Sequence, residues 1–247
     1  MKNKITVKSN NLLAVEGKDE CNFFKAVLEY ENINNIQVID IGGKDKFKIE
    51  FPLLINSEGF SEVHALGFVR DAEEDQALSA FSSICGILKK NGLPVPKIMN
   101  SINNERNMKI GVFIMPNNID EGMLEDLCLE SVKTKPVFEC VNEYIKCCLS
   151  DLSEDEKNIN VSKAKIGILH TALKVVYTFL QDIPGKRKQD SRKCKAGNER
   201  GPKIQTYLAS KKPIVNSLGL AATKGYWDFE ENCFSEIKQF LHSLFSE

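Results

Sequence analysis

The sequence has almost no net charge and no long hydrophobic run. Lys and Arg number 33 against 34 Asp and Glu, which gives a formal net charge of −1 over 247 residues. A chain so close to neutral has no overall attraction to a polyanion, so any contact with nucleic acid depends on local clusters of Lys and Arg. No run reaches the length of a membrane span, and the opening MKNKITVKSN lacks the apolar segment of a signal peptide. We therefore expect no membrane partner.

Two kinds of local motif are also absent. The chain has eight cysteines, but none of them shows the C-x-x-C spacing of a zinc site. Several cysteines lie inside apolar helical patterns, where a free thiol packs as a small hydrophobic group, and a reducing, cytoplasmic location is the simplest interpretation. The stretch IGGKDKF has neither spacing of the glycine-rich phosphate loops. This excludes nucleotide binding of those kinds.

Strand-like and helix-like segments alternate over roughly the first half of the sequence. Short apolar, β-branched runs predict strands at 11–15, 36–43, 64–71 and 109–116. Helical spacing of apolar residues predicts helices at 19–30, 75–92 and 122–132, and a partly helical segment at 44–60, which Pro52 limits. This alternation predicts an α/β fold with a central parallel sheet flanked by helices.

The pattern changes to helices after about residue 134. Apolar helical spacing predicts helices at 137–152, 163–180 and 233–245. Between the last two lies a basic loop at 184–203, in which Lys186 to Lys203 contains eight Lys or Arg residues. We expect residues 1–133 to form the α/β core and 134–247 a mainly helical C-terminal extension packed on it. The basic loop can neutralise phosphates without reading sequence, or it can be a solvated surface loop.

Acidic residues follow the predicted strands at the point where each strand ends. Glu16 follows the first strand, Asp71 and Glu73 the third, and Glu125 the fourth, while Glu20 lies one helical turn beyond Glu16. The carboxyl ends of parallel strands meet at one edge, where ligands bind in such sheets. Carboxylates brought together there repel one another unless a cation lies between them, and oxygen ligands without histidine favour Mg²⁺ or Mn²⁺.

Each acidic motif also has a simpler explanation. Glu16 can be a carboxylate favoured by the dipole of the helix that follows, and DAEED at 71–75 can be a solvated helix start. The metal interpretation depends on both motifs occurring in this order.

The layout resembles the Toprim domain, the metal-binding module of type IA and type II topoisomerases, bacterial primases and OLD-family nucleases. The residues that carry the resemblance are LLAVEG, IQVIDIGG and GFVRDAE, and VEGKDE is similar to the V-E-G-x-x-E form of OLD-like proteins. GMLEDLCL and KGYWDFEENCFSEIKQFL resemble a small stand-alone Toprim-like family of unassigned function. The resemblance implies that Glu16, Glu20, Asp71, Glu73 and Glu125 hold metal.

The third motif departs from the family pattern. Where D-x-D is usual, this chain has Asp71-Ala72-Glu73, which keeps a carboxylate and adds a methylene. Three outcomes stay open: coordination with altered geometry, a weakened second metal, or replacement by Asp75.

The resemblance implies Mg²⁺- or Mn²⁺-dependent hydrolysis of phosphodiesters in DNA or RNA. Glu16, Asp71 and Glu73 would be catalytic, with Lys203, or Lys224 in its place, neutralising charge on the phosphate. OLD-like relatives serve in phage defence, so an ATPase or another defence protein is the expected partner. The alternative is a non-catalytic Toprim-derived module that binds nucleic acid or protein, which the Glu73 departure and the near-neutral charge favour.

Overall fold

The computed structural model describes residues 6–43, 46–73, 77–118, 121–150, 161, 163–166, 168 and 217–246. The predicted basic loop at 184–203, Asp75, Lys203 and most of the helix predicted at 163–180 lie outside these residues. None of the helices in the described ranges is both long enough and apolar enough to cross a membrane.

A five-stranded sheet in the order β2-β1-β3-β5-β4 forms the centre of the fold. The strands are β1 (Asn11–Val15), β2 (Ile36–Asp40), β3 (Ala65–Asp71), β4 (Ile102–Glu105) and β5 (Met108–Met115). β2, β1, β3 and β5 are mutually parallel, and β4 pairs antiparallel with β5 at one edge. The α/β prediction is confirmed, and β4 is an addition that the sequence reading did not contain.

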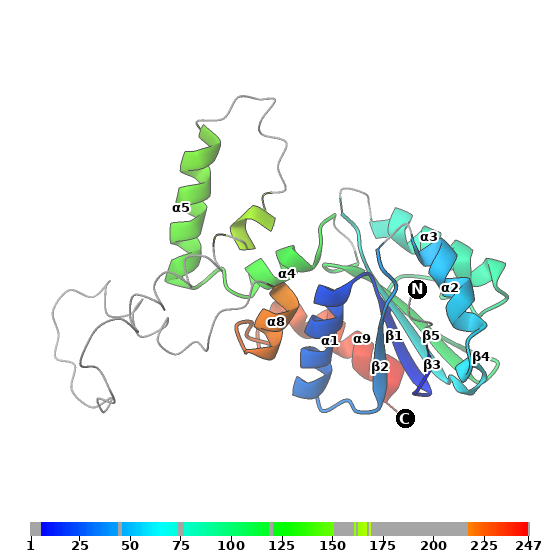
Figure 1. The fold of residues 1–247 in the computed structure, drawn as a ribbon. Coiled ribbons are helices and arrows are strands. Elements are labelled where there is room, and N and C mark those ends of the chain that lie inside the picture. The colour runs from blue at the N-terminus through cyan, green and yellow to red at the C-terminus, as the bar shows by residue number, and fades with distance from the viewer. Residues whose placement is uncertain are drawn as a thin grey trace.

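Helices cover both faces of the sheet (Figure 1). Their bounds are α1 (Lys18–Tyr30), α2 (Phe47–Ile55), α3 (Ala77–Lys90), α4 (Leu124–Glu130), α5 (Pro136–Ser150), α8 (Leu218–Thr223) and α9 (Ser235–Phe245), with short 3₁₀ turns at Phe60–Glu62 and Asn232–Phe234. α2 and α3 lie on one face, and α1 and α9 lie on the other. α5 stands off the sheet, although Val141 and Ile145 pack into the same cluster as α1 and α9.

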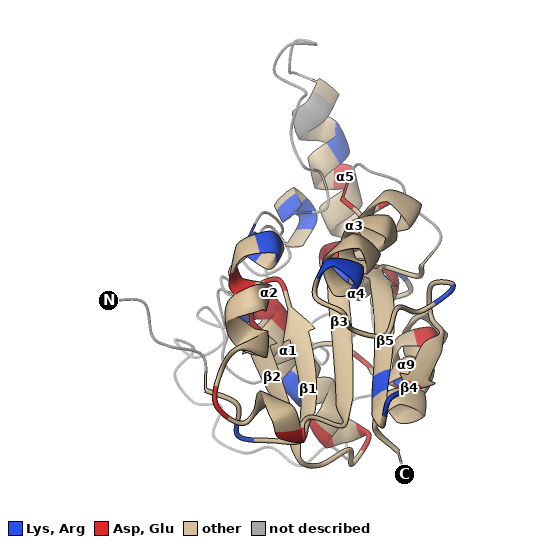
Figure 2. Cartoon of the chain, turned by 90° about the vertical axis from the view of Figure 1, so that its right-hand side faces the viewer, with Lys and Arg blue, Asp and Glu red and all other residues tan. Residues whose placement is uncertain are grey.

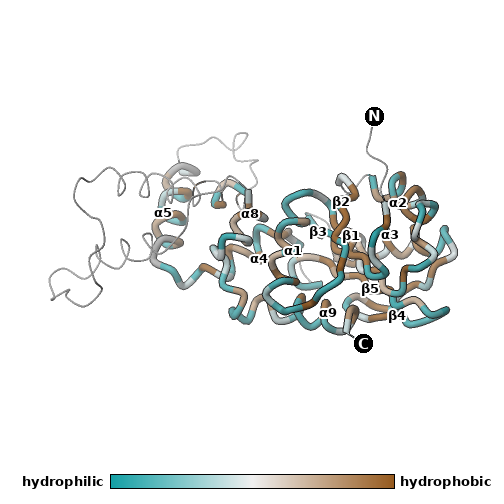
Figure 3. The backbone as a smooth tube through the Cα atoms, turned by 60° about the horizontal axis from the view of Figure 1, so that its bottom comes forward, coloured by the Kyte–Doolittle hydropathy of each residue, from teal (hydrophilic) through white to brown (hydrophobic). Residues whose placement is uncertain are grey.

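The alternation of side chains along the strands builds two separate cores. Leu13, Val15 and Phe113 point to the cluster shared with α1 and α9, whereas Leu12 and Val112 point to the cluster shared with α2 and α3. Such strands read as continuous apolar runs because both faces are buried. In Figure 3 brown is frequent along the central strands, whereas the helices around them alternate between brown and teal.

The last described helix packs unusually close to the central strands. A Cβ at Gly67 would lie 2.7 Å from Leu13 Cδ1 and from Leu244 Cδ2. A Cβ at Gly111 would lie 2.7 Å from Phe240 Cε2. The two glycines therefore make the room that α9 occupies, and the C-terminal segment covers the middle of the sheet.

Candidate metal centre

The turn after β2 holds the end of β1 in place. The carbonyl oxygen of Glu16, the first residue beyond β1, accepts hydrogen bonds from the backbone N–H groups of Gly42 and Gly43, at 2.9 and 2.7 Å. Gly42 and Gly43 have φ angles of +88° and +106°, which glycine adopts without a steric penalty. Glu16 is thus fixed at the carboxyl edge of the sheet, the uppermost edge in Figure 2.

The side chain of Glu16 is buried beside one cation. Its Oε1 lies 3.4 Å from Nε of Arg70, and the two side chains are 13% and 12% exposed, respectively. Neither atom has a hydrogen-bond partner within the described residues, so the charges are close but not aligned as a hydrogen bond. Burial raises the pKa of Glu16 to about 7, Arg70 acts against this shift, and Glu73 and Glu20 add to it.

Asp71 is the last residue of β3 and lies at the same edge of the sheet. Its Oδ1 accepts a hydrogen bond of 3.2 Å from the backbone N–H of Leu124, the first residue of α4. Burial raises the pKa of Asp71 well above its ordinary value, and the negative charges of Glu16, Glu20 and Glu125 raise it further. The structure therefore brings Asp71 into electrostatic contact with carboxylates from β1, α1 and α4.

Glu20 and Glu125 complete this group, which we call the acidic cluster: Glu16, Glu20, Asp71 and Glu125. Burial is the main cause that raises the pKa of both glutamates, and Glu20 adds to the shift of Glu125. Lys163 acts in the opposite direction on Glu125. The carboxylate of Glu20 folds back over Gly17, where a Cβ would lie 2.9 Å from its Oε2.

Glu73 lies at the border of the acidic cluster. Its backbone forms an isolated bridge with Gly122, with N–H···O distances of 2.8 Å in both directions, and its φ is +59°. This bridge joins the segment after β3 to the segment before α4. The charge of Glu73 raises the pKa of Glu16, so its carboxylate acts on the cluster from a backbone position that few non-glycine residues adopt.

The chemistry of the cluster fits a hard divalent cation, but its side chains are spread apart. No three His, Cys, Asp or Glu side chains in the described ranges are arranged so that they could hold a metal ion as they stand. Glu16 lies beside the guanidinium of Arg70, which partly balances its charge. The buried Oε1 of Glu16, which has no hydrogen-bond partner among the described residues, and the carboxylate oxygens around it are donors of the kind that a hard divalent cation prefers.

A family model described as "Protein of unknown function (DUF3226)" matches residues 10–246. The chain belongs to this family. No functionally curated protein matches the sequence.

Similar solved structures come from one protein of Xanthomonas campestris pv. campestris. Three structures of the C-terminal region of its OLD protein, phased with mercury, iodine and platinum, are 15%, 16% and 14% identical to this chain. Each match covers 95% of both chains, with TM-scores of 0.40, 0.36 and 0.35. A likeness this distant carries no functional argument for the DUF3226 chain.

Sequence reasoning missed two charged residues at this edge of the DUF3226 chain. Arg70 interrupts an apolar strand one residue before Asp71, and that interruption was the available signal. Asp40 ends β2, accepts a hydrogen bond of 2.7 Å from the N–H of Gly42, and adds to the raised pKa of Glu20. Of the basic candidates, Lys203 lies outside the described residues, and Lys224 is the exposed C-cap of α8.

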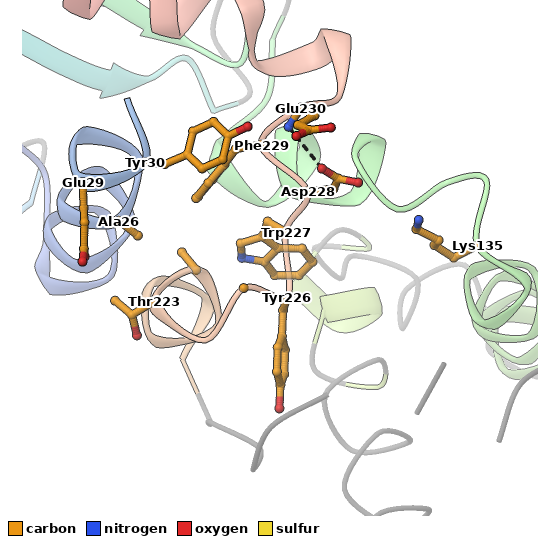
Figure 4. A pocket seen from close by; sticks show the side chains of 12 residues that line it. Ala26, Glu29, Tyr30, Lys135, Thr223, Tyr226, Trp227, Asp228, Phe229 and Glu230 are labelled. Carbon is orange, nitrogen blue, oxygen red and sulfur yellow. Dashed lines mark hydrogen bonds between the residues drawn. The ribbon is translucent and has the colours of Figure 1, made fainter. Parts of the chain in front are cut away.

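A separate cavity of about 500 Å³ lies at the other end of α1 (Figure 4). Its lining includes Tyr30, Trp227 and Asp228, and it contains no member of the acidic cluster. Trp227 is 3% exposed and donates from Nε1 to the carbonyl oxygen of Leu218 at 3.2 Å. This tryptophan therefore ties the segment before α9 to α8, and the cavity plays no part in the candidate metal centre.

Proposed function

We propose that this protein is a Mg²⁺- or Mn²⁺-dependent phosphodiesterase that hydrolyses DNA or RNA. The observation that carries the proposal is the placement of four partly buried carboxylates at one edge of the sheet, after β1, at the end of β3 and in the first turns of α1 and α4. Each has a raised pKa, for which burial is the main cause. Such a cluster costs folding free energy unless a cation neutralises it, so selection for a binding site explains it better than selection for stability. The Toprim-like and OLD-like sequence motifs support the same chemistry.

Each residue has a role in this proposal. Glu16 and Asp71 would hold the ion from the ends of β1 and β3, Glu20 and Glu125 would complete the oxygen shell, and Glu73 would reach the same edge with its longer side chain. A bound divalent ion supplies a Lewis acid that neutralises phosphate oxygens and lowers the pKa of water. The burial of these carboxylates keeps their charge weakly screened, so they hold a cation more strongly than exposed carboxylates would. Lys203 stays our proposal for the cation that stabilises charge on the phosphate.

The test is cleavage of supercoiled plasmid and of tRNA in Mn²⁺ or Mg²⁺. We expect Glu16→Gln and Asp71→Asn each to lower the cleavage rate at least about 100-fold, because each removes a charged ligand. Glu58→Gln, at an exposed position after α2, is the matched control and should cleave at the wild-type rate. Equal cleavage by wild type and both site variants would overturn the proposal.

A second candidate is a binding module that holds nucleic acid or a partner protein without hydrolysis. It is favoured by the spread of the side chains, since no described group of three is arranged to hold an ion, and by glutamate at position 73. Metal-dependent binding of the same substrates without cleavage would support this candidate. A role in phage defence, with an ATPase as partner, is a further proposal that rests on the OLD-like motifs.

A further inference from the structure

One cationic side chain lies within the acidic edge itself. Arg70 occupies β3 directly before Asp71, and its Nε is 3.4 Å from Oε1 of Glu16, with the Arg70 side chain only 12% exposed. Arginine keeps its charge at any pH at which a protein is folded, so a buried guanidinium requires a nearby anion. In this structure the anion beside Arg70 is Glu16.

The contact between these two residues is close but poorly formed. Neither Nε of Arg70 nor Oε1 of Glu16 makes a hydrogen bond to a described residue, although both atoms are buried. An aligned, bidentate pair between arginine and carboxylate would gain two charge-assisted hydrogen bonds, and this pair lacks that gain at these atoms. Glu16 is therefore held by charge alone at this contact, and a stronger cation can replace Arg70.

We propose that Arg70 is a built-in counter-cation, which a divalent metal displaces from Glu16 and which then contacts the phosphate of bound nucleic acid. The inference rests on the proposed function and assigns within it a residue that binds substrate. A divalent ion at Glu16 repels the guanidinium, and a phosphate drawn to that ion offers it a new anion. The planar fork of arginine matches the oxygens of a phosphate.

If metal displaces Arg70 from Glu16, substitution of Arg70 should change metal affinity and nucleic-acid affinity in opposite directions. Arg70→Gln removes the competitor for Glu16, so metal should bind more tightly. The same substitution removes a phosphate contact, so nucleic acid should bind more weakly. A residue with a purely structural role would lower both affinities or change neither.

The experiment measures two affinities in the full chain. Mn²⁺ binding to the metal-free protein is measured by titration calorimetry, and binding of a labelled single-stranded 12-nucleotide DNA, and of RNA of the same sequence, by fluorescence anisotropy in Ca²⁺. For Arg70→Gln we expect Mn²⁺ affinity to rise at least about tenfold, because two charges this close interact strongly even when partly screened. We expect oligonucleotide affinity to fall about tenfold, the effect of losing a charge-assisted contact.

Two further variants keep the test decisive. Arg106→Gln removes an exposed arginine at the turn between β4 and β5, at the opposite end of β5, and should leave both affinities unchanged. Arg70→Lys keeps the charge and loses the fork, so Mn²⁺ affinity should stay near that of wild type while oligonucleotide affinity falls several-fold. If Arg70→Gln does not fold, the lysine variant decides, and wild-type oligonucleotide binding by it would overturn the inference.

The failures of the two proposals can be told apart. Wild type that cleaves with Mn²⁺, together with an Arg70→Gln variant whose Mn²⁺ affinity is unchanged or lower, overturns this inference alone. Unchanged oligonucleotide affinity in that variant does the same. Wild type that neither binds Mn²⁺ nor cleaves overturns the proposed function, and the inference with it.

Discussion

The middle and the carboxyl ends of the same central strands differ sharply in what they bury. In the middle, Leu13 and Phe113 are fully buried in apolar surroundings, and Gly67 admits the helix α9. A few residues further along, β1 and β3 lead into Glu16 and Asp71, whose pKa values burial raises. One short stretch of backbone thus passes from residues that stabilise the fold to residues that lower its stability when they ionise. The middle of the strands is therefore the structural scaffold, and their carboxyl ends form the candidate site.

The largest expected effect comes from breaking the scaffold. Phe113→Ala should lower the free energy of unfolding by about 3–5 kcal/mol, because it empties a fully buried position against Phe240, whose ring centroid lies 5.4 Å away. Chemical denaturation measures the loss, which should be the same at pH 5 and pH 8.

An exposed apolar residue supplies the control for that loss. Leu53 is 60% exposed, so Leu53→Ala should change the free energy of unfolding by no more than about 0.5 kcal/mol. If the loss in the free energy of unfolding caused by Phe113→Ala depended on Mn²⁺, the apolar middle of the sheet would not be independent of the acidic cluster.

The second effect is a pH dependence that comes from the site. Glu16 titrates near 4.5 in an unfolded chain and near 7 in the folded one, so between these values the folded state binds more protons. The stability of the metal-free protein should therefore fall as pH rises through this window, by about 3 kcal/mol at most from this residue. Glu16→Gln should remove that part of the slope, as measured by denaturation at several pH values.

Two comparisons sharpen the pH prediction. Glu58→Gln should keep the wild-type slope, because Glu58 is exposed. Saturating Mn²⁺ should reverse the slope in wild type, since metal binds the ionised carboxylates and protons compete with it. A slope that is equal in wild type and in Glu16→Gln would show that Glu16 does not titrate in this window.

The smallest effect on stability should accompany a clear effect on metal binding. Gly17 has an extended backbone, with φ −152° and ψ −172°, so alanine fits there without backbone strain. Its Cβ would lie 2.9 Å from Oε2 of Glu20, however, and this carboxylate must swing away. Gly17→Ala should change the free energy of unfolding by less than about 1 kcal/mol and weaken Mn²⁺ binding roughly tenfold in calorimetry.

Gly86→Ala in α3 is the matched control, because a Cβ there meets no atom within 4 Å. It should stabilise the helix by about 0.5–1 kcal/mol and leave Mn²⁺ binding unchanged. Unchanged Mn²⁺ affinity in Gly17→Ala would remove Glu20 from the set of ligands.

Sequence patterns predicted the parts of the fold that local periodicity encodes. The apolar run at 11–15 and the helical spacing at 233–245 correspond to β1 and to α9 with the short 3₁₀ turn before it, and the carboxyl edge was located correctly because it follows from parallel strands. β4 was missed because INNE is polar and does not alternate, so only its pairing with β5 makes it a strand. α8 was missed because its LGLAAT sequence is too short for helical periodicity.

The candidate site was predictable in position and less so in its contacts. Glu16 and Asp71 follow strands and could be placed by topology alone. The contact of Arg70 with Glu16 depends on which strands are neighbours and on how two side chains turn, and neither is encoded locally. The left-handed backbone of Glu73 arises from its bridge to Gly122, a contact between two loops.

The close seating of α9 on Gly67 and Gly111 has a consequence for biosynthesis. The strands that carry these glycines leave the ribosome well before residues 235–245 do, so the part of the sheet face that α9 covers stays exposed while translation continues. The nascent chain therefore exposes apolar surface, and the contact between α9 and the strands, which are distant in sequence, forms last. Exposed apolar surface of this kind favours aggregation and binding by chaperones. A chain truncated before α9 would keep this apolar surface exposed, and we expect it to be degraded.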